Sequence, residues 1–152
     1  MSATIALPTT GSTMPDVALT TTSGDPVRLA EVVAGSRSVV FFMRSSGCAI
    51  CLGHVATLVK MVQGGELEGV RVIIITPGDA SDAAKVATRV PAGVATVYAS
   101  GIDHSAVGLG TFLTIQHSGT FVLAADGTVL TVRTATIPTG SFSRDEVLAA
   151  LA

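Results

Sequence analysis

The sequence has few charged residues and no cluster of one sign. Charged side chains make up 13% of its 152 residues, nine of them basic and eleven acidic, and the only lysines are Lys60 and Lys85. A nucleic-acid surface needs concentrated positive charge to release counterions, so no nucleic-acid partner is expected. A membrane helix needs roughly 20 apolar residues in a row, and runs such as "VRVIIIT" at 70–76 are far shorter. We therefore expect no membrane partner.

The first residues also lack the features of a secretory signal. The stretch "MSATIALPTTGSTMPDV" has no basic start and only a three-residue apolar piece, so the sequence predicts a cytoplasmic protein. Residues 1–13, rich in Thr, Ser, Pro and Gly, predict a flexible arm, and 14–152 predict a single domain. A chain of this length can bury roughly two thirds of its unfolded surface in one core. Its apolar fraction of 48% is also compatible with a homodimer.

What the sequence does contain is an alternation of buried strands and helices. Continuous apolar runs predict strands at 38–43, 70–76 and 94–99. A helix is predicted after the first run, because apolar residues recur there at helical spacing: Ile50, Val55, Leu58, Val59 and Val62. This helix is expected to end at the "GG" of 64–65. A second helix follows the 70–76 strand, with Asp79 or Ser81 as its N-cap. This order predicts a parallel core sheet with right-handed crossovers.

Two antiparallel hairpins are predicted to flank this core. "DVALTTTSGDPVRLAEVV" reads as a hairpin that leads into a helical turn, and "GTFVLAADGTVLTVRTAT" reads as two strands joined at "DG". A short helical stretch is expected near 102–109, and a closing helix begins at Ser143 with Glu146 in the capping-box position. The predicted fold class is α/β: a thioredoxin-like three-layer fold with a central mixed sheet of about five strands flanked by helices, plus an extra N-terminal β-hairpin.

Both cysteines, Cys48 and Cys51, lie where the first core strand gives way to a helix. A thiol attacks only as its thiolate, and free cysteine, with a pKa near 8.5, is mostly protonated at neutral pH. A helix N-terminus favours the thiolate through its unpaired N–H groups, and we expect Cys48 in the first turn. Two intervening residues put the sulfurs one turn apart, where they can close a disulfide. The spacing therefore predicts a redox-active CxxC pair.

Other interpretations of the pair remain open. Free cysteine is among the most buried residue types, so two inert core thiols also fit. A structural zinc site usually takes two close pairs of ligands, and here the ligands would come from one pair together with single histidines: Cys48, Cys51, His54 and either His104 or His117. Covalent haem is not expected, because Leu52 stands where its motif needs histidine. No cofactor is predicted.

Two charged or titratable residues stand close to the cysteines in sequence. Arg44, four residues before Cys48, is either a cationic contribution to the thiolate or a solvated loop arginine. His54, three residues after Cys51, is either a proton relay on the same helix face or a partly exposed histidine without a role.

Three stretches resemble the peroxiredoxin-like proteins of the alkyl hydroperoxide reductase and thiol-specific antioxidant group, in the thioredoxin-fold superfamily. The stretches are "MPDVALTTTSGDPVRLAEVV", "VVFFMRSSGCAICLGHVATL" and "GTFVLAADGTVL", and the resemblance runs from about residue 14 to 151. It implies a thiol-dependent antioxidant oxidoreductase that reduces peroxides or disulfides. It also implies a thioredoxin-like or low-molecular-weight thiol as the reductant.

The family's active-site pattern, PxxxTxxC, fits in two ways. If Cys48 attacks, Ser45 takes the threonine's place and Phe41 the proline's; if Cys51 attacks, Cys48 and Arg44 take those places. The leading hypothesis is that Cys48 attacks and Cys51 resolves the product.

The resemblance also implies an arginine just before the late strand, or, in thioredoxins, a cis-proline. The sequence reads "QHSGTF" there, with Gly119 in the place of the proline and Thr120 after it. Arg133 and Arg71 are candidates to replace the arginine. These departures keep a further hypothesis open, a non-catalytic thioredoxin-fold binding domain.

Overall fold

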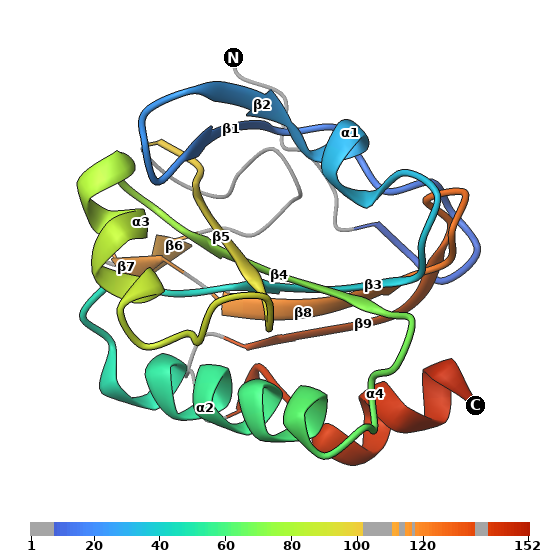
Figure 1. Cartoon of the computed structure of the whole chain (residues 1–152). Coiled ribbons are helices and arrows are strands. Elements are labelled where there is room, and N and C mark those ends of the chain that lie inside the picture. Colours follow the sequence, from blue (N-terminus) through green and yellow to red (C-terminus); the bar gives the residue numbers. More distant parts are fainter. Residues whose placement is uncertain (1–7, 102–110, 113–114, 117, 136–139) are drawn as a thin grey trace.

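The computed structural model describes residues 8–101, 111–112, 115–116, 118–135 and 140–152. They form a layered α/β fold in which α2 and α4 lie along one face of the sheet and α1 lies on the other (Figure 1). The elements, in chain order, are β1 Ala18–Thr21, β2 Pro26–Arg28, α1 Leu29–Val33, β3 Ser38–Phe42, α2 Ala49–Gln63, β4 Arg71–Thr76, α3 Ala80–Ala87, β5 Thr96–Ala99, β6 Thr111–Phe112, β7 Ile115–Gln116, β8 Ser118–Leu123, β9 Val129–Ala135 and α4 Arg144–Leu151.

The main sheet has seven strands in the order β2-β1-β5-β4-β3-β8-β9. Strands β3, β4 and β5 are parallel, while β8 and β9 continue the sheet in antiparallel pairs. These five strands are the predicted core, and β1 and β2 are the predicted N-terminal hairpin, which joins the sheet through β5. The predicted thioredoxin-like fold class is confirmed. The small β6–β7 sheet was not predicted.

Strand β3, the middle one of the five core strands, is buried over all five residues, which explains the apolar run that follows Ser38. Val39 and Phe41 face the core on the side of α2, and Val40 and Phe42 face the core on the side of α1. Burying a large apolar side chain contributes about 1.5–3 kcal/mol. A strand with two apolar faces therefore fixes both layers against the sheet.

Helix α2 buries one stripe of side chains that includes Cys51, Val55 and Leu58. Ile50, which the sequence pattern placed on this stripe, is instead 43% exposed. It lies about 100° around the helix from Cys51, and this angle takes its side chain off the buried stripe.

The helix caps agree with the sequence in part. Asp79 is the N-cap of α3, and Asp82 completes its capping box. Ser143 is the N-cap of α4 and accepts a hydrogen bond from the Glu146 amide at 3.3 Å. The Glu146 carboxylate does not return to the Ser143 amide, as a capping box requires, because it bonds Arg133 and Thr131 instead.

The described part of the predicted N-terminal arm runs beside the β8–β9 turn. The Gly11 amide donates to the Val129 carbonyl at 2.8 Å, and the Met14 amide donates to the Gly127 carbonyl at 2.9 Å. Met14 is buried in the core on the α1 side of the sheet. The helical stretch expected near 102–109 lies outside the described residues.

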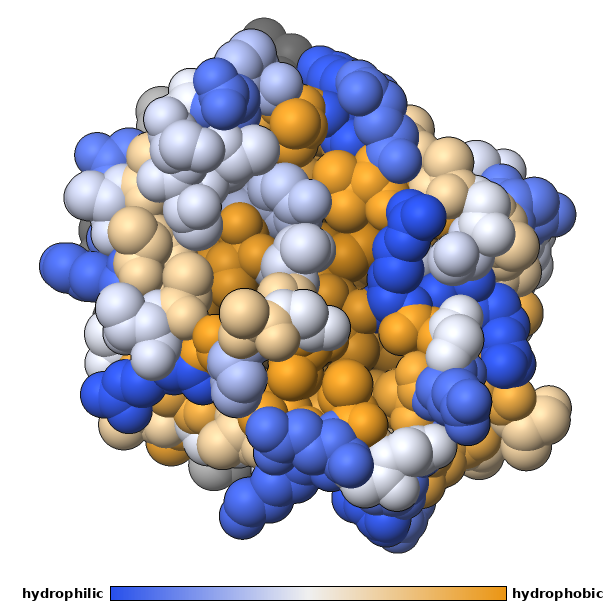
Figure 2. Space-filling view, in the orientation of Figure 1, coloured by the Kyte–Doolittle hydropathy of each residue, from blue (hydrophilic) through white to orange (hydrophobic). Residues whose placement is uncertain are grey.

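The face of the molecule that carries α3 and β5 shows apolar residues across its middle, bordered by hydrophilic ones (Figure 2). A hollow of about 350 Å³ lies along β5, and another of about 320 Å³ lies between the start of β4 and the segment that leads into β5. In the described part of the chain, no helix has the length and apolar character needed to cross a membrane.

Candidate active site

The cysteines lie just beyond the carboxyl end of β3. The Met43 amide donates to the Ile75 carbonyl at 2.8 Å, which prolongs the pairing of β3 and β4 by one residue. The chain then turns, and the Cys48 amide donates to the Ser45 carbonyl at 3.3 Å. This turn places Cys48 at the start of α2.

One side-chain bond fastens this loop to the next helix. The Ser46 hydroxyl donates to Oδ1 of Asp82 at 2.9 Å. Oδ2 of the same carboxylate accepts from the Asp79 amide at the N-terminus of α3. Asp82 therefore links the capping of α3 to the position of the cysteine loop. This link was not predicted from the sequence, which marked the start of the helix only by Asp79 or Ser81 as its N-cap.

Cys48 is the N-cap of α2, one position before the first turn in which the sequence placed it. Its Sγ accepts a hydrogen bond from the Cys51 amide at 3.3 Å. This amide is one of the N–H groups that a helix N-terminus leaves without an intrahelical partner. A thiolate accepts such a bond more strongly than a thiol does, because the acceptor then carries a full charge.

Cys51 has a different environment, one turn further into the helix. Its side chain is completely buried, and its Sγ accepts from the Arg44 amide at 3.4 Å. Burial raises the pKa of the Cys51 thiol to about 12; the Arg44 amide acts against this shift, and the neighbouring Cys48 adds to it. Both cysteines are free thiols in this structure.

Arg44 and His54 make contacts other than those expected from the sequence. Arg44 is half-buried and reaches Cys51 through its backbone amide, while its charge makes the smallest contribution to the pKa of Cys51. The His54 ring packs edge-on against Phe41, with centroids 5.7 Å apart, and lies 5.4 Å from the ring of Phe142. The proposed proton relay through His54 remains a prediction.

The other expected site residues lie on or beside the same edge of the sheet. Ser45 is exposed. Gly119 pairs with Phe42 across β3 and β8. Thr120 is buried, and its hydroxyl donates to the Ser141 carbonyl at 2.7 Å. The role of Thr120 that the contacts support is to tie β8 to the segment before α4.

Ser118, which stands in the "QHSGTF" stretch where the resemblance implies an arginine, was not predicted to be a site residue, yet its hydroxyl is buried without a partner in the described part of the chain. Its side chain is 1% exposed, and its hydroxyl has no hydrogen-bond partner among the residues that the structure describes. Because side chains alternate along a strand, Ser118 faces the same side of the sheet as Thr120. Its neighbour His117, like His104, lies outside the described residues.

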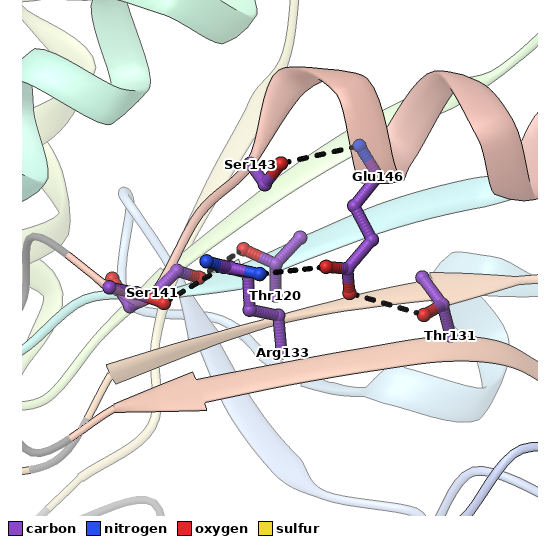
Figure 3. Close-up of polar contacts among 7 residues, drawn as sticks. Thr120, Thr131, Arg133, Ser141, Ser143 and Glu146 are labelled. Atoms are coloured by element: carbon purple, nitrogen blue, oxygen red, sulfur yellow. Dashed lines mark hydrogen bonds and ion pairs between the residues drawn. The ribbon is translucent and has the colours of Figure 1, made fainter.

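The two arginines considered as substitutes are both engaged in other contacts. Arg133 donates to Oε2 of Glu146 at 2.8 Å and to the Gly140 carbonyl at 2.9 Å, and this network joins β9 to α4 (Figure 3). Arg71 opens β4 and donates to the Ala34 carbonyl at 3.2 Å. Because β3 and β4 are parallel, the start of β4 is at the opposite end of the sheet from the cysteines. The suggestion of Arg71 as a substitute was therefore wrong.

The metal-site alternative gains no support from the described residues. Within them, no three His, Cys, Asp or Glu side chains gather closely enough to hold a metal ion.

Solved structures of known proteins share this fold. A peroxiredoxin-like protein from Aquifex aeolicus matches with a TM-score of 0.77 at 15% identity, over 96% of this chain and 87% of that chain. Peroxidoxin BcpB from Mycobacterium tuberculosis matches with a TM-score of 0.72 at 21% identity, over 95% of this chain and 96% of that chain. Reduced Prx3 in complex with H2O2 from Vibrio vulnificus matches with a TM-score of 0.77 at 20% identity, over 100% of both chains. Identities this low show the fold alone.

The family assignment comes from the sequence. A comparison with curated proteins finds no match. The model of the AhpC/TSA family, in contrast, matches residues 10–132, from the segment before β1 to within β9, and these include both cysteines. The chain belongs to the AhpC/TSA family.

Proposed function

We propose that this chain is a thiol peroxidase in which Cys48 attacks the peroxide and Cys51 resolves the product. One observation carries the proposal: the Cys48 sulfur sits at the N-terminus of α2 and accepts the Cys51 amide there. Membership of the AhpC/TSA family supports a peroxide as the substrate.

The proposed reaction has two steps. The Cys48 thiolate attacks one oxygen of the peroxide, the O–O bond breaks, and the second oxygen leaves with a proton as water or an alcohol. Cys48 is then a sulfenic acid. The Cys51 thiol attacks its sulfur, the Cys48–Cys51 bond forms as the S–O bond breaks, and the proton released by Cys51 goes to the leaving hydroxide to form water.

The different environments of the two thiols support this division of roles. With a pKa of about 12, Cys51 is protonated at neutral pH and is a poor first nucleophile. It is also completely buried, whereas Cys48 retains 3% exposure. Cys51 is better suited to attack a sulfur that is already beside it.

Mass spectrometry of the single cysteine variants tests the assignment. After one equivalent of hydrogen peroxide, we expect Cys51→Ser to accumulate a sulfenic acid on Cys48, which dimedone traps. Cys48→Ser should remain a free thiol, and the wild type should lose two hydrogens by forming the internal disulfide. A dimedone adduct on Cys51 in Cys48→Ser, with none on Cys48 in Cys51→Ser, would reverse the two roles.

A second candidate is thiol-disulfide exchange without peroxide chemistry. It is favoured by Ser118, because a buried hydroxyl stands before Gly119, where the family resemblance implies an arginine that polarises the peroxide. Stopped-flow oxidation by hydrogen peroxide separates the two candidates. A rate no faster than that of free cysteine, together with rapid reduction of a disulfide substrate, would favour exchange. Inert thiols in both assays would favour a non-catalytic binding domain.

A further inference from the structure

A groove opens beside the cysteine loop, between the start of α2 and the end of α3. Its volume is about 350 Å³, and it is lined by Ser46, Gly47, Leu52, Lys85, Thr88 and Arg89. Gly47 precedes Cys48 and Leu52 follows Cys51, so the groove borders the redox pair on both sides in the sequence. Pockets for small molecules have volumes of about 300–1,000 Å³, so this groove suits a ligand of modest size.

Among the residues that the structure describes, the lining of the groove carries positive charge and no acidic side chain. Lys85 lies in the last turn of α3, Arg89 lies just beyond the C-cap of this helix, and both are exposed. In the described part of the chain the ion pairs are made by Arg28, Arg133 and Arg144, so neither groove cation is neutralised by a carboxylate there. Two such cations are notable in a chain with a net charge of -2 and only two lysines.

The acidic residue of α3 nearest to Lys85 in sequence has other hydrogen-bond partners. Asp82 lies one turn before Lys85, and its two oxygens accept from the Ser46 hydroxyl and the Asp79 amide. At the other end of the helix, the Thr88 hydroxyl donates to the Lys85 carbonyl at 2.6 Å. This bond satisfies one of the carbonyls that the C-terminus of a helix leaves without an intrahelical partner.

We propose that this groove binds the carboxylates of a low-molecular-weight thiol that reduces the oxidised pair. The inference rests on the proposed function, because it supplies the reductant that closes the cycle. Charge complementarity favours an anionic ligand over a neutral one. The small volume favours a single thiol molecule over a protein surface.

The reduction is balanced with two thiols. The first, as thiolate, attacks Sγ of Cys48, the less buried of the two cysteines; the Cys48–Cys51 bond breaks, and Cys51 leaves and takes up a proton. A second thiolate attacks the small-molecule sulfur of the mixed disulfide. The products are a small-molecule disulfide and Cys48 as thiolate.

Matched charge reversals test the proposal, with glutathione as the probe because it is a tripeptide thiol with two carboxylates. Lys85→Glu places an acid in the groove, and Lys60→Glu makes the same charge change in the last turn of α2, outside the groove. Reduction of the preformed disulfide by glutathione is compared with reduction by neutral 2-mercaptoethanol, per thiolate present. We expect Lys85→Glu to slow glutathione about tenfold, and to leave 2-mercaptoethanol within about twofold. Lys60→Glu should change neither rate.

Direct binding gives a second measurement that does not depend on turnover. S-methylglutathione cannot react, and it should bind the wild type and Lys60→Glu but not Lys85→Glu, in a manner that weakens with salt. Equal glutathione rates in the two variants, or no binding to the wild type, would overturn the proposal. The proposal would also be overturned, in favour of a protein partner, if Lys85→Glu slowed reduction of the disulfide by a thioredoxin-type protein but not by glutathione.

The design separates this inference from the proposed function. The disulfide can be installed with diamide, so the reduction assay runs even if peroxide does not oxidise the pair. Failure to react with peroxide would contradict the peroxidase proposal alone, and unchanged glutathione kinetics in Lys85→Glu would contradict the groove alone.

Discussion

The two cysteines at the start of α2 are both buried, but their sulfurs accept from different amides. Sγ of Cys48 accepts from the Cys51 amide, and Sγ of Cys51 accepts from the Arg44 amide. The paired spacing and the strand-to-helix junction were visible in the sequence. These hydrogen-bond partners were not, because they depend on the path of the loop between β3 and α2.

The loop contacts were less predictable at the residue scale. The sequence pattern drew attention to Ser45, which is exposed, whereas the neighbouring Ser46 makes the bond to Asp82. Two adjacent serines in a polar loop cannot be told apart until the path of α3 is known. The same holds for Ser118, whose burial follows from its register opposite Ala135 and beside the end of β3.

Ser118 and Thr120 give a paired prediction about buried hydroxyls. Ser118→Ala removes a buried hydroxyl that has no partner in the described part of the chain, so we expect the unfolding free energy to rise by up to about 1 kcal/mol. Thr120→Val removes the donor to the Ser141 carbonyl, and we expect a loss of about 1 kcal/mol. Urea unfolding of the reduced protein measures both. A clear loss of stability in Ser118→Ala would mean that its hydroxyl is satisfied.

At the scale of elements, the strands and hairpins were predictable because their apolar runs are buried on both faces or end at clear turn residues. The Asp126–Gly127 turn, with Gly127 at φ 88°, joins β8 and β9 as expected. The second half of the α4 capping box was not predictable. The sequence suggests the Ser143 amide as the partner of the Glu146 carboxylate, but the fold brings Arg133 of β9 close enough to bond this carboxylate instead.

The N-terminus of α3 connects helix capping to the cysteine loop, and Gly78 tests this connection. Gly78 has φ +108°, and a Cβ there would lie 2.1 Å from Oδ2 of Asp82. We expect Gly78→Ala to displace this carboxylate, release the Ser46 hydroxyl and lower the unfolding free energy by about 2–3 kcal/mol, from backbone strain and loss of the cap.

Gly93→Ala is the matched control for this variant. Gly93 also has positive φ, at +81°, but a Cβ there meets nothing within 4 Å. We expect only the strain of about 1–2 kcal/mol and an unchanged peroxide rate. Chemical denaturation and stopped-flow oxidation should show a larger loss of stability and slower oxidation in Gly78→Ala. Identical behaviour of the two variants would mean that Asp82 does not hold the loop.

At the scale of the whole molecule, the buried thiol links stability to pH. The pKa of Cys51 is about 12 in the folded chain, against an ordinary value of 9.0. Below pH 9 both states keep the proton, so the contribution to stability is constant. Above pH 9 the unfolded chain releases the proton and the folded chain does not, so stability falls as pH rises toward 12.

This link predicts an alkaline loss of stability that depends on one residue. Between about pH 8 and pH 10.5 the unfolding free energy of the reduced wild type should fall by about 2 kcal/mol more than that of Cys51→Ala. The cavity that this substitution leaves in the core lowers stability by the same amount at both pH values. Urea unfolding of both proteins at the two pH values measures the difference. Parallel losses would show that Cys51 ionises in the folded chain as readily as in the unfolded one.

The thiol that caps α2 also makes the first turn of this helix sensitive to oxidation. In the reduced chain the Cys48 sulfur is the acceptor for the Cys51 amide. A sulfur that is bonded in a disulfide is a weaker acceptor and must turn toward its new partner. The Cys51 amide proton then exchanges more readily with solvent. The backbone of residue 51 is therefore a built-in reporter, and hydrogen exchange or a single NMR resonance can read the redox state of the pair without an added label.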